Sequence, residues 1–399
     1  MPINITDWQK RLEPVLTPLG RGYARLMARR AEAYAARGFG YVGPLARYFA
    51  GHTPGVPCIS VGNIAWGGTG KTPLVRWLGR WFTDHGHKPV VLTRGYGGRP
   101  SRLPLAVNPH SLPEEAGDEA LMLARSGIPV VVDPRRARSA AWVESRFAPD
   151  VLIMDDDFQH LALARDLDLV ILTPHDLGEG WGRVLPGGTW REGPEALKRA
   201  SAFLVHADPA TFDELQRDIA LALVPLGKPV FAFHLRAAGL RLVGKYLPLP
   251  APAEQDGASE PTPTAPPPAV DRFGHAPDLA GAPYALVSGV GAPERVAVTA
   301  EELFGYAPQQ EIRFGDHHAY TPSDAAKLAA LRDSGLEIVC TAKDAVKLAE
   351  LAAFPFWVLE VEPVFQQSIE GLIWEDWLRD IWADLQGRRR SGNHKGLAP

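Results

Sequence analysis

A glycine-rich segment carries the strongest chemical signal in this chain of 399 residues. It reads Ala65-Trp66-Gly67-Gly68-Thr69-Gly70-Lys71-Thr72. A short apolar run precedes it and a helical pattern follows it, which is the setting that a phosphate loop requires. Glycines let backbone amides approach phosphate oxygens, and the start of a helix adds a favourable dipole. We predict that residues 67–70 surround nucleotide phosphates, that Lys71 reaches the β and γ phosphates, and that the Thr72 hydroxyl binds Mg²⁺.

Three consecutive carboxylates, Asp155, Asp156 and Asp157, follow a second apolar run. In phosphate-loop proteins a carboxylate at the C-terminal end of a strand holds the metal. Mg²⁺ is usually bound through one or two carboxylates plus substrate phosphates. We therefore predict a Mg²⁺ site here. An acidic loop without a ligand role stays the alternative when the residues are taken alone.

Other segments contain chemically capable side chains but carry less information. By its position before an apolar helical pattern, Asp118 is most simply a helix cap. A single histidine such as His317 is more often a packed or surface residue than a catalyst. The residues alone assign neither of them a chemical role.

The elements that must position these residues follow a strand–loop–helix rhythm from residue 57 onward. Short runs rich in Val, Ile and Leu alternate with helical stretches, which favours a parallel sheet covered on both faces. A Pro-, Ala- and acid-rich stretch at 248–268 interrupts this rhythm, which then resumes on a smaller scale. We predict a P-loop NTPase-like α/β fold with a doubly wound, mostly parallel sheet and a second, smaller α/β domain.

These patterns divide the chain into five parts. We predict an amphipathic helical segment packed on the core at 1–50, a phosphate-loop domain at 51–235, a hinge with the Pro-rich insertion at 236–270, a smaller α/β domain at 271–385, and a flexible basic tail at 386–399.

The first part is basic, with eight Lys or Arg and three Asp or Glu among residues 1–50. Arg21, Arg25, Arg29 and Arg30 lie among apolar residues at helical spacing. Such a helix can rest on an anionic membrane surface. A helix packed on the domain with a solvated basic face fits the pattern equally well.

Composition excludes several other classes of protein. The formal net charge is −4, which argues against nucleic acid as a partner. Two distant cysteines rule out a disulfide framework and a cysteine-based zinc cluster, and they fit a reducing compartment. No apolar run reaches the roughly 18 residues of a membrane-spanning helix, and the N-terminus does not read as a secretory signal. We therefore expect a cytoplasmic protein.

Eight segments occur in a fixed order along the chain. They are SVGNIAWGGTGKTP, LTRGYGG, AGDEALMLA, DDDFQH, LPGGTWRE, SGVGAPERV, FGDHHAY and TAKDAVKL. In this order they resemble the tetraacyldisaccharide 4′-kinases of lipid A biosynthesis, over roughly residues 10–360. The resemblance implies ATP- and Mg²⁺-dependent phosphorylation of the 4′-hydroxyl of a tetraacylated glucosamine disaccharide 1-phosphate. We further expect a monomer that binds peripherally to the inner face of the cytoplasmic membrane.

The resemblance also implies roles for individual residues. Asn63 and the loop from Gly67 to Thr72 would bind the nucleotide, and Thr72, Asp155, Asp156 and Glu192 would form the metal site. Asp118 matches the acid that takes the proton from the attacking hydroxyl. His317, from the smaller domain, matches the histidine that assists it.

Two residues depart from the family pattern. Asp157 replaces a glycine, which adds like charge near the metal and removes an easy positive φ. Ala342 replaces a glutamate. Two other functions stay open on the residues: a deviant phosphate-loop regulatory ATPase or GTPase, and a nucleotide-binding module without catalysis.

Overall fold

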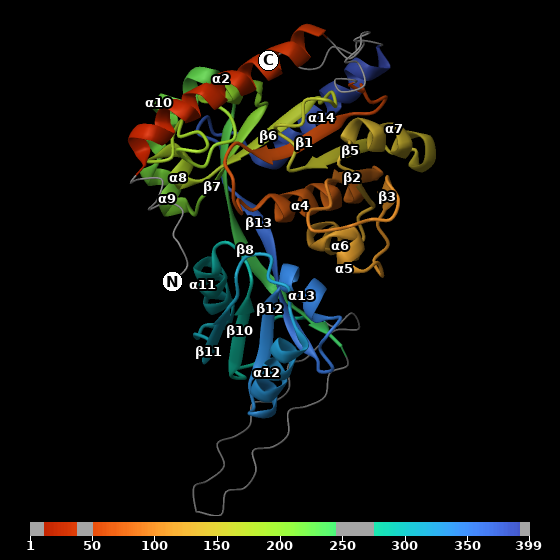
Figure 1. The fold of residues 1–399 in the computed structure, drawn as a ribbon, viewed down its shortest axis with the longest axis vertical. Helices are drawn as coiled ribbons and strands as arrows, with labels where there is room; N and C mark the ends of the chain where they lie inside the picture. The colour runs from red at the N-terminus through yellow and green to blue at the C-terminus, as the bar shows by residue number, and fades with distance from the viewer. Residues whose placement is uncertain (1–11, 38–50, 245–274, 392–399) are drawn as a thin grey trace, which may run out of the picture.

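The computed structural model describes residues 12–37, 51–244 and 275–391. One mostly parallel sheet of 13 strands runs through these residues and joins a larger to a smaller domain (Figure 1). From edge to edge the strands are β11 (Gln310–Arg313), β10 (Tyr284–Ser288), β12 (Glu337–Thr341), β13 (Phe356–Phe365), β8 (Val230–Val243), β7 (Ala202–His206), β6 (Leu167–Leu172), β1 (Cys58–Asn63), β5 (Val151–Asp155), β2 (Pro89–Thr93), β4 (Val130–Val132) and β3 (Leu105–Ala106), while β9 (His275–Ala276) pairs with β8.

The larger domain buries both faces of its sheet, as its runs of apolar residues predict. Along β1, Ile59 and Val61 pack under helix α4 (Lys71–Asp84), whereas Cys58 packs on the opposite face under α7 (Arg136–Phe147). Helix α6 (Asp118–Arg125) shares the α4 face. The remaining short helices of this domain are α5 (Pro113–Ala116), α8 (Pro174–Leu177), η1 (Pro194–Arg199), α9 (Pro209–Glu214), α10 (Gln216–Ala222) and η2 (Val224–Leu226).

The smaller domain repeats this layering around β10 and β12. Val287 on β10 belongs to one apolar cluster and Leu286 to another on the opposite face. Three helices flank the strands: α11 (Pro293–Phe304), α12 (Pro322–Asp333) and α13 (Ala342–Leu348). The predicted smaller α/β domain therefore has its own two-sided core.

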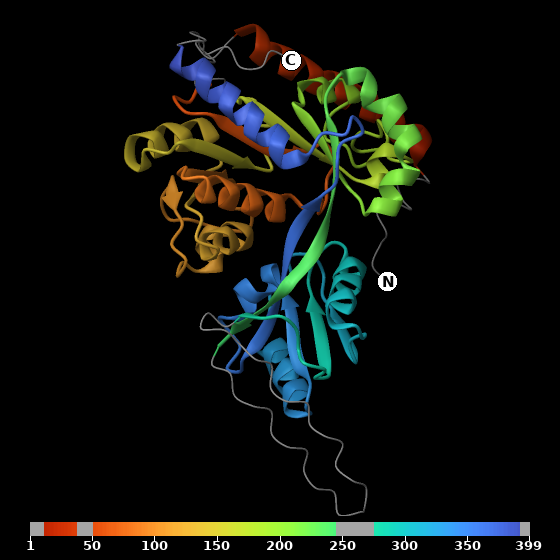
Figure 2. The same ribbon diagram turned by 180° about the vertical axis from the view of Figure 1, so that it is seen from behind.

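Two long antiparallel strands, β8 and β13, connect the domains (Figures 1 and 2). Their pairing extends from Phe356 opposite Val243 to Phe365 opposite Phe233. β7 supports the larger-domain end of β8, and β12 supports the smaller-domain end of β13. The middle of this ribbon is the structural counterpart of the predicted hinge. The Pro-rich stretch itself lies outside the described residues.

The last helix, α14 (Trp374–Arg390), corrects the predicted boundary of the smaller domain at 385. Trp374, Leu378 and Trp382 pack into the core of the larger domain, on the α4 face. The chain returns to the larger domain along β13, so these apolar side chains pack there although the preceding elements belong to the smaller domain. Local sequence does not indicate this return. The helix also includes residues 386–390 of the predicted flexible tail, and Arg389 binds the carboxylate of Asp166 at 2.7 Å. Residues 392–399 lie outside the described part.

Helix α2 (Glu13–Arg37) lies along the larger domain (Figure 1). Gly20 is buried, and Tyr23 and Ala24 pack against the apolar cluster beneath. Leu19 and Leu26 stay exposed beside the basic residues of the same helix. Among the described residues, no helix is both long and apolar enough to cross a membrane.

Candidate active site

The phosphate loop connects β1 to α4, and a histidine side chain supports it through a hydrogen bond to its backbone. Gly70, which precedes α4, has φ 84°, a conformation that favours glycine. The Nδ1 atom of His206, at the end of β7, lies 3.1 Å from the carbonyl oxygen of Thr69. Burial lowers the pKa of His206 to about 4, so the ring is neutral at pH 7 and donates to that carbonyl as its Nδ1–H tautomer. No local sequence pattern indicates this support, because His206 is far from the loop along the chain.

Lys71 points into a polar cluster at the carboxyl ends of β1 and β5. Its Nζ atom lies 3.2 Å from Asn63 Oδ1 and 3.5 Å from Asp156 Oδ1. Parallel strands bring their carboxyl ends to the same edge of a sheet, which is why these distant residues meet. The structure therefore brings together three residues that the sequence assigned to nucleotide and metal binding.

Asp155 is a candidate cation ligand, because a buried oxygen of its carboxyl group has no partner in the part of the chain that the structure describes. It is buried at the end of β5, and its Oδ1 atom has no hydrogen-bond partner among the described residues. Burial, and then the charges of Glu119 and Asp156, raise the pKa of Asp155 to about 8. A divalent cation would give Asp155 Oδ1 a partner and offset the repulsion from Glu119 and Asp156.

The donor set suits Mg²⁺ better than a metal that needs a complete protein cage. The described residues contain no group of three or more His, Cys, Asp or Glu side chains arranged to hold a metal ion. Mg²⁺ normally takes one or two carboxylates and completes its shell with phosphates and water. Asp155, Asp156 and the buried Thr72 hydroxyl fit that pattern.

Asp156 turns towards the loop through a left-handed backbone, with φ 55°. Arg191 binds its carboxylate at 2.9 Å and also hydrogen-bonds to the side chain of Asn63. Burial alone would raise the pKa of Asp156, but Lys71 and Arg191 together hold it below its usual value. Arg191 was given no role from the sequence, although it lies in one of the eight segments.

Asp157 is turned away from the phosphate loop. It is buried and forms an ion pair with Arg136 of α7. Burial raises the pKa of Asp157 to about 6, against the effect of Arg136. The left-handed conformation belongs to Asp156 instead, so the aspartate that replaces the family glycine needs no positive φ. Its charge is met mainly by Arg136.

Glu192 is buried and forms an ion pair with Arg199 at 2.8 Å. The Arg199 guanidinium in turn covers the ring of Phe158, 4.5 Å from its centroid. The contacts of the described residues do not join Glu192 to Asp155 or Asp156. Its role as a metal ligand stays a prediction.

Asp118 and His317 meet across the boundary between the two domains. Asp118 is the first residue of α6 and its side chain makes no capping hydrogen bond, so the cap expected from sequence is wrong. Its Oδ2 atom lies 3.7 Å from His317 Nδ1. His317 has a left-handed backbone, with φ 58°, and its ring centre is 5.0 Å from that of Tyr96.

Lys347 is a third member of this group that the sequence did not assign. It lies on α13 of the smaller domain, and its Nζ atom is 2.9 Å from Asp118 Oδ2. The same ammonium donates to the carbonyl of His318 at 2.8 Å. One carboxylate of the larger domain is thus approached by an imidazole and an ammonium of the smaller domain. Lys347 lies in TAKDAVKL, one of the eight segments, and this was its signal in the sequence.

A cavity of about 600 Å³ lies between the domains. The phosphate loop, α6, α11, α13 and the hinge strands all contribute to its walls. Representative lining residues are Gly68, Thr72, Glu119, His206, Arg295 and Lys343. This size suits a nucleotide, because ligand pockets commonly measure about 300–1,000 Å³.

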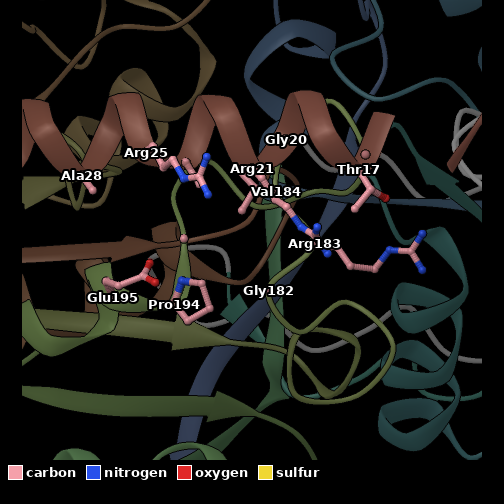
Figure 3. Close-up of a pocket in the computed structure, with 13 residues that line it drawn as sticks. Thr17, Gly20, Arg21, Arg25, Ala28, Gly182, Arg183, Val184, Pro194 and Glu195 are labelled. Atoms are coloured by element: carbon pink, nitrogen blue, oxygen red, sulfur yellow. The ribbon is translucent and has the colours of Figure 1, made fainter. Parts of the chain in front are cut away.

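A second cavity, of about 520 Å³, lies between α2 and the loop at 182–195 (Figure 3). Arg21 and Arg25 of α2 and Arg183 of the loop line it, together with Glu195. Three guanidinium groups against one carboxylate make this cavity basic.

Comparison with known proteins identifies the family. The family model for tetraacyldisaccharide-1-P 4′-kinase matches residues 12–377. The tetraacyldisaccharide 4′-kinase of Nitratidesulfovibrio vulgaris is 43% identical over 98% of this chain and 99% of its own length. That of Oleidesulfovibrio alaskensis is 44% identical over 96% of this chain and 98% of its own.

A solved structure agrees on the fold. LpxK from Aquifex aeolicus, crystallised in complex with ATP, matches with a TM-score of 0.64 and 24% identity, over 95% of this chain and 99% of that one. The predicted fold class is therefore confirmed. On the sequence matches, this chain belongs to the tetraacyldisaccharide-1-P 4′-kinase family.

Proposed function

We propose that this kinase transfers the γ-phosphoryl group of ATP to the 4′-hydroxyl of a tetraacylated glucosamine disaccharide 1-phosphate, a step of lipid A biosynthesis. One observation carries the proposal: in a chain of this family, an inter-domain cavity has the phosphate loop on one wall and lies beside the group formed by Asp118, His317 and Lys347. A regulatory ATPase or an inert nucleotide-binding module has no need of that group.

The phosphate loop and its neighbours would hold the nucleotide. Backbone amides of residues 67–70 and the Lys71 ammonium would contact the β and γ phosphates. Asp155, Asp156 and Thr72 would hold Mg²⁺, which when bound neutralises charge on the phosphates. Arg191, already on Asp156, keeps that carboxylate ionised and oriented. In this arrangement the protein contributes mainly position and charge, which is what phosphoryl transfer requires.

Asp118 would accept the proton of the attacking sugar hydroxyl. A hydroxyl is a poor nucleophile, and a carboxylate within hydrogen-bond reach assists it as the new bond forms. Lys347 Nζ and His317 Nδ1, both from the smaller domain, would fix the orientation of this carboxylate. Because its partners come from the other domain, the group is complete only when the two domains are close.

Helix α2 would bring the enzyme to its lipid. Exposed Leu19 and Leu26 offer an apolar surface, and the neighbouring arginines favour anionic headgroups. The basic cavity beneath the helix is lined in part by Arg21 and Arg25 of α2 itself (Figure 3). We propose that α2 binds peripherally to the inner face of the cytoplasmic membrane. The monomeric state and the absence of nucleic acid partners stay predictions.

Transfer of labelled γ-phosphate tests the proposed function. Purified enzyme is incubated with labelled ATP, Mg²⁺ and the acylated disaccharide 1-phosphate in mixed micelles, and products are separated by thin-layer chromatography. The expected result is label on the lipid, with little ATP hydrolysis when lipid is omitted. Rapid hydrolysis without lipid would instead favour a regulatory ATPase, and ATP binding without transfer would favour an inert module.

A further inference from the structure

Arg76 joins the phosphate-loop helix directly to the hinge. It lies on α4, a turn and a half after Lys71, and only 8% of it is exposed. Its Nη1 atom binds Glu360 Oε2 at 2.7 Å, and its Nη2 atom donates to the backbone carbonyl of Val361. Both partners are on β13. Arg76 and Val361 also line the cavity between the domains.

The contact falls where the hinge ribbon is irregular. The register of β13 against β8 shifts between Glu360 and Val361, which leaves Ala238 of β8 without a partner opposite. Next to it, Gly239 has φ 120°, a conformation that side chains disfavour. Such a bulge disrupts the ladder locally and bends the strand. We therefore expect the ribbon to bend at this bulge when the angle between the domains changes.

Glu360 is held from both domains. Its Oε1 atom binds Arg241 Nε at 2.9 Å, towards the smaller-domain end of β8, while its Oε2 atom binds Arg76 of the larger domain. Burial would raise the pKa of Glu360, but Arg76 and Arg241 together hold it below its usual value. The carboxylate thus stays charged and ties α4 to both strands of the hinge.

We infer that Arg76 is a positioning residue that couples nucleotide binding at the start of α4 to the angle between the domains. The inference rests on the proposed function. Phosphates bound at the loop fix the position of the start of α4. The Arg76 guanidinium, through its hydrogen bonds to Glu360 and the Val361 carbonyl, then fixes the position of the bulge relative to α4. The hinge angle in turn sets how closely His317 and Lys347 approach Asp118. Arg76 touches neither reacting group.

Two variants test the coupling, and a matched pair serves as control. Arg76→Lys keeps the charge but cannot hold Glu360 and the Val361 carbonyl in the same fork geometry. Glu360→Gln keeps the shape of the acceptor and removes its charge. Arg236 and Glu362 form an ion pair at 2.8 Å on the same two strands, but both are solvent-exposed, so Arg236→Lys and Glu362→Gln are the controls.

Steady-state kinetics and ATP titration give the first readout. We expect Arg76→Lys and Glu360→Gln to lower kcat by about 10- to 100-fold, because small misplacements of reacting groups have effects of this size. The ATP dissociation constant should rise by much less than kcat falls, since the phosphate loop is intact, and the controls should match wild type. An unchanged kcat, or a loss of ATP affinity as large as the loss of kcat, would overturn the inference.

A distance measurement separates this inference from the proposed function, because it needs no lipid. Labels are attached to Ser145→Cys on α7 and Lys327→Cys on α12, both exposed, while the native Cys58 and Cys340 are buried. With a non-hydrolysable ATP analogue and Mg²⁺, the inter-domain distance distribution of the otherwise wild-type protein should narrow. In the Arg76→Lys and Glu360→Gln backgrounds it should stay broad. Equal narrowing in all backgrounds would refute the coupling even if transfer activity were confirmed; if Arg76→Lys fails to fold, Glu360→Gln decides the result.

Discussion

Replacing Asp118 by asparagine should abolish most phosphoryl transfer while leaving ATP binding intact. The amide keeps the shape of the side chain and can still accept from Lys347 Nζ, which lies 2.9 Å from Oδ2, but it cannot take up the hydroxyl proton. A general base contributes about 10²–10⁴-fold. At about 1.4 kcal/mol per tenfold, this corresponds to about 3–5 kcal/mol of transition-state stabilisation.

The fold should tolerate this change because the neighbours of Asp118 keep other partners. Lys347 also donates to the carbonyl of His318 at 2.8 Å, and the His317 ring lies beside Tyr96. The assay is initial-rate transfer to the lipid acceptor, with ATP affinity measured in parallel by calorimetry. Glu114→Gln, an exposed acid on the neighbouring α5, is the control and should behave as wild type. A kcat for Asp118→Asn within about threefold of wild type would refute the assignment, because a general base accounts for far more than that.

Four further predictions follow from individual contacts. Gly70→Ala should weaken ATP binding by at least about tenfold, because Gly70 has a positive φ and an added Cβ atom would lie 3.1 Å from His206 Nδ1. An ATP titration measures this, with Gly22→Ala as the control that should bind ATP as wild type does, because no atom lies within 4 Å of the Cβ it adds. Trp382→Ala should lower the free energy of unfolding, measured by urea denaturation, by about 3–5 kcal/mol. The Trp382 ring is buried against Phe82, and its Nε1 atom donates to His87. Trp66→Ala, at an exposed position, should change the free energy of unfolding little. His206 has a folded pKa of about 4, below its usual 6.5, so its contribution to stability is complete above pH 6.5 and is lost as the pH falls towards 4. His206→Asn should therefore remove about 3 kcal/mol of the loss of stability between pH 6.5 and pH 4, measured by urea denaturation at both pH values; an unchanged pH dependence would contradict this. Changing Arg21, Arg25, Arg29 and Arg30 to glutamine should weaken binding to anionic liposomes by about 1 kcal/mol per arginine at low salt, and the difference from wild type should shrink at high salt; equal binding in co-sedimentation would exclude α2 as the membrane contact.

The arrangement of the short continuous segments could be predicted from the sequence. The phosphate loop is formed by consecutive residues between a strand and a helix, and Asp155 directly follows an apolar run. Their meeting at one sheet edge follows from the parallel topology that the strand rhythm predicts. The proximity of these residues could therefore be predicted from the sequence, and their roles stay predictions.

The remainder depends on contacts between residues that are distant in sequence. His206 supports the loop from β7, and Lys347 reaches Asp118 from the other domain. The local pattern alone indicated a helix cap for Asp118, because its neighbours along the chain show only a helix start, and its catalytic role was predicted from the family resemblance instead. Helix α14 was assigned to the smaller domain because sequence order placed it there, although its tryptophans pack on the larger one. Local patterns do not encode which of two cores an apolar stripe will join.

In the proposed function, one phosphate loop and one inter-domain base act together on a lipid-borne hydroxyl. The most direct test locates the phosphate in the product by mass spectrometry for wild type, Lys71→Ala and Asp118→Asn, with ATP affinity determined for each. We predict phosphate at the 4′ position for wild type, loss of both ATP binding and product for Lys71→Ala, and loss of product alone for Asp118→Asn. Phosphate at another position, or product formed at the wild-type rate by either variant, would contradict the account.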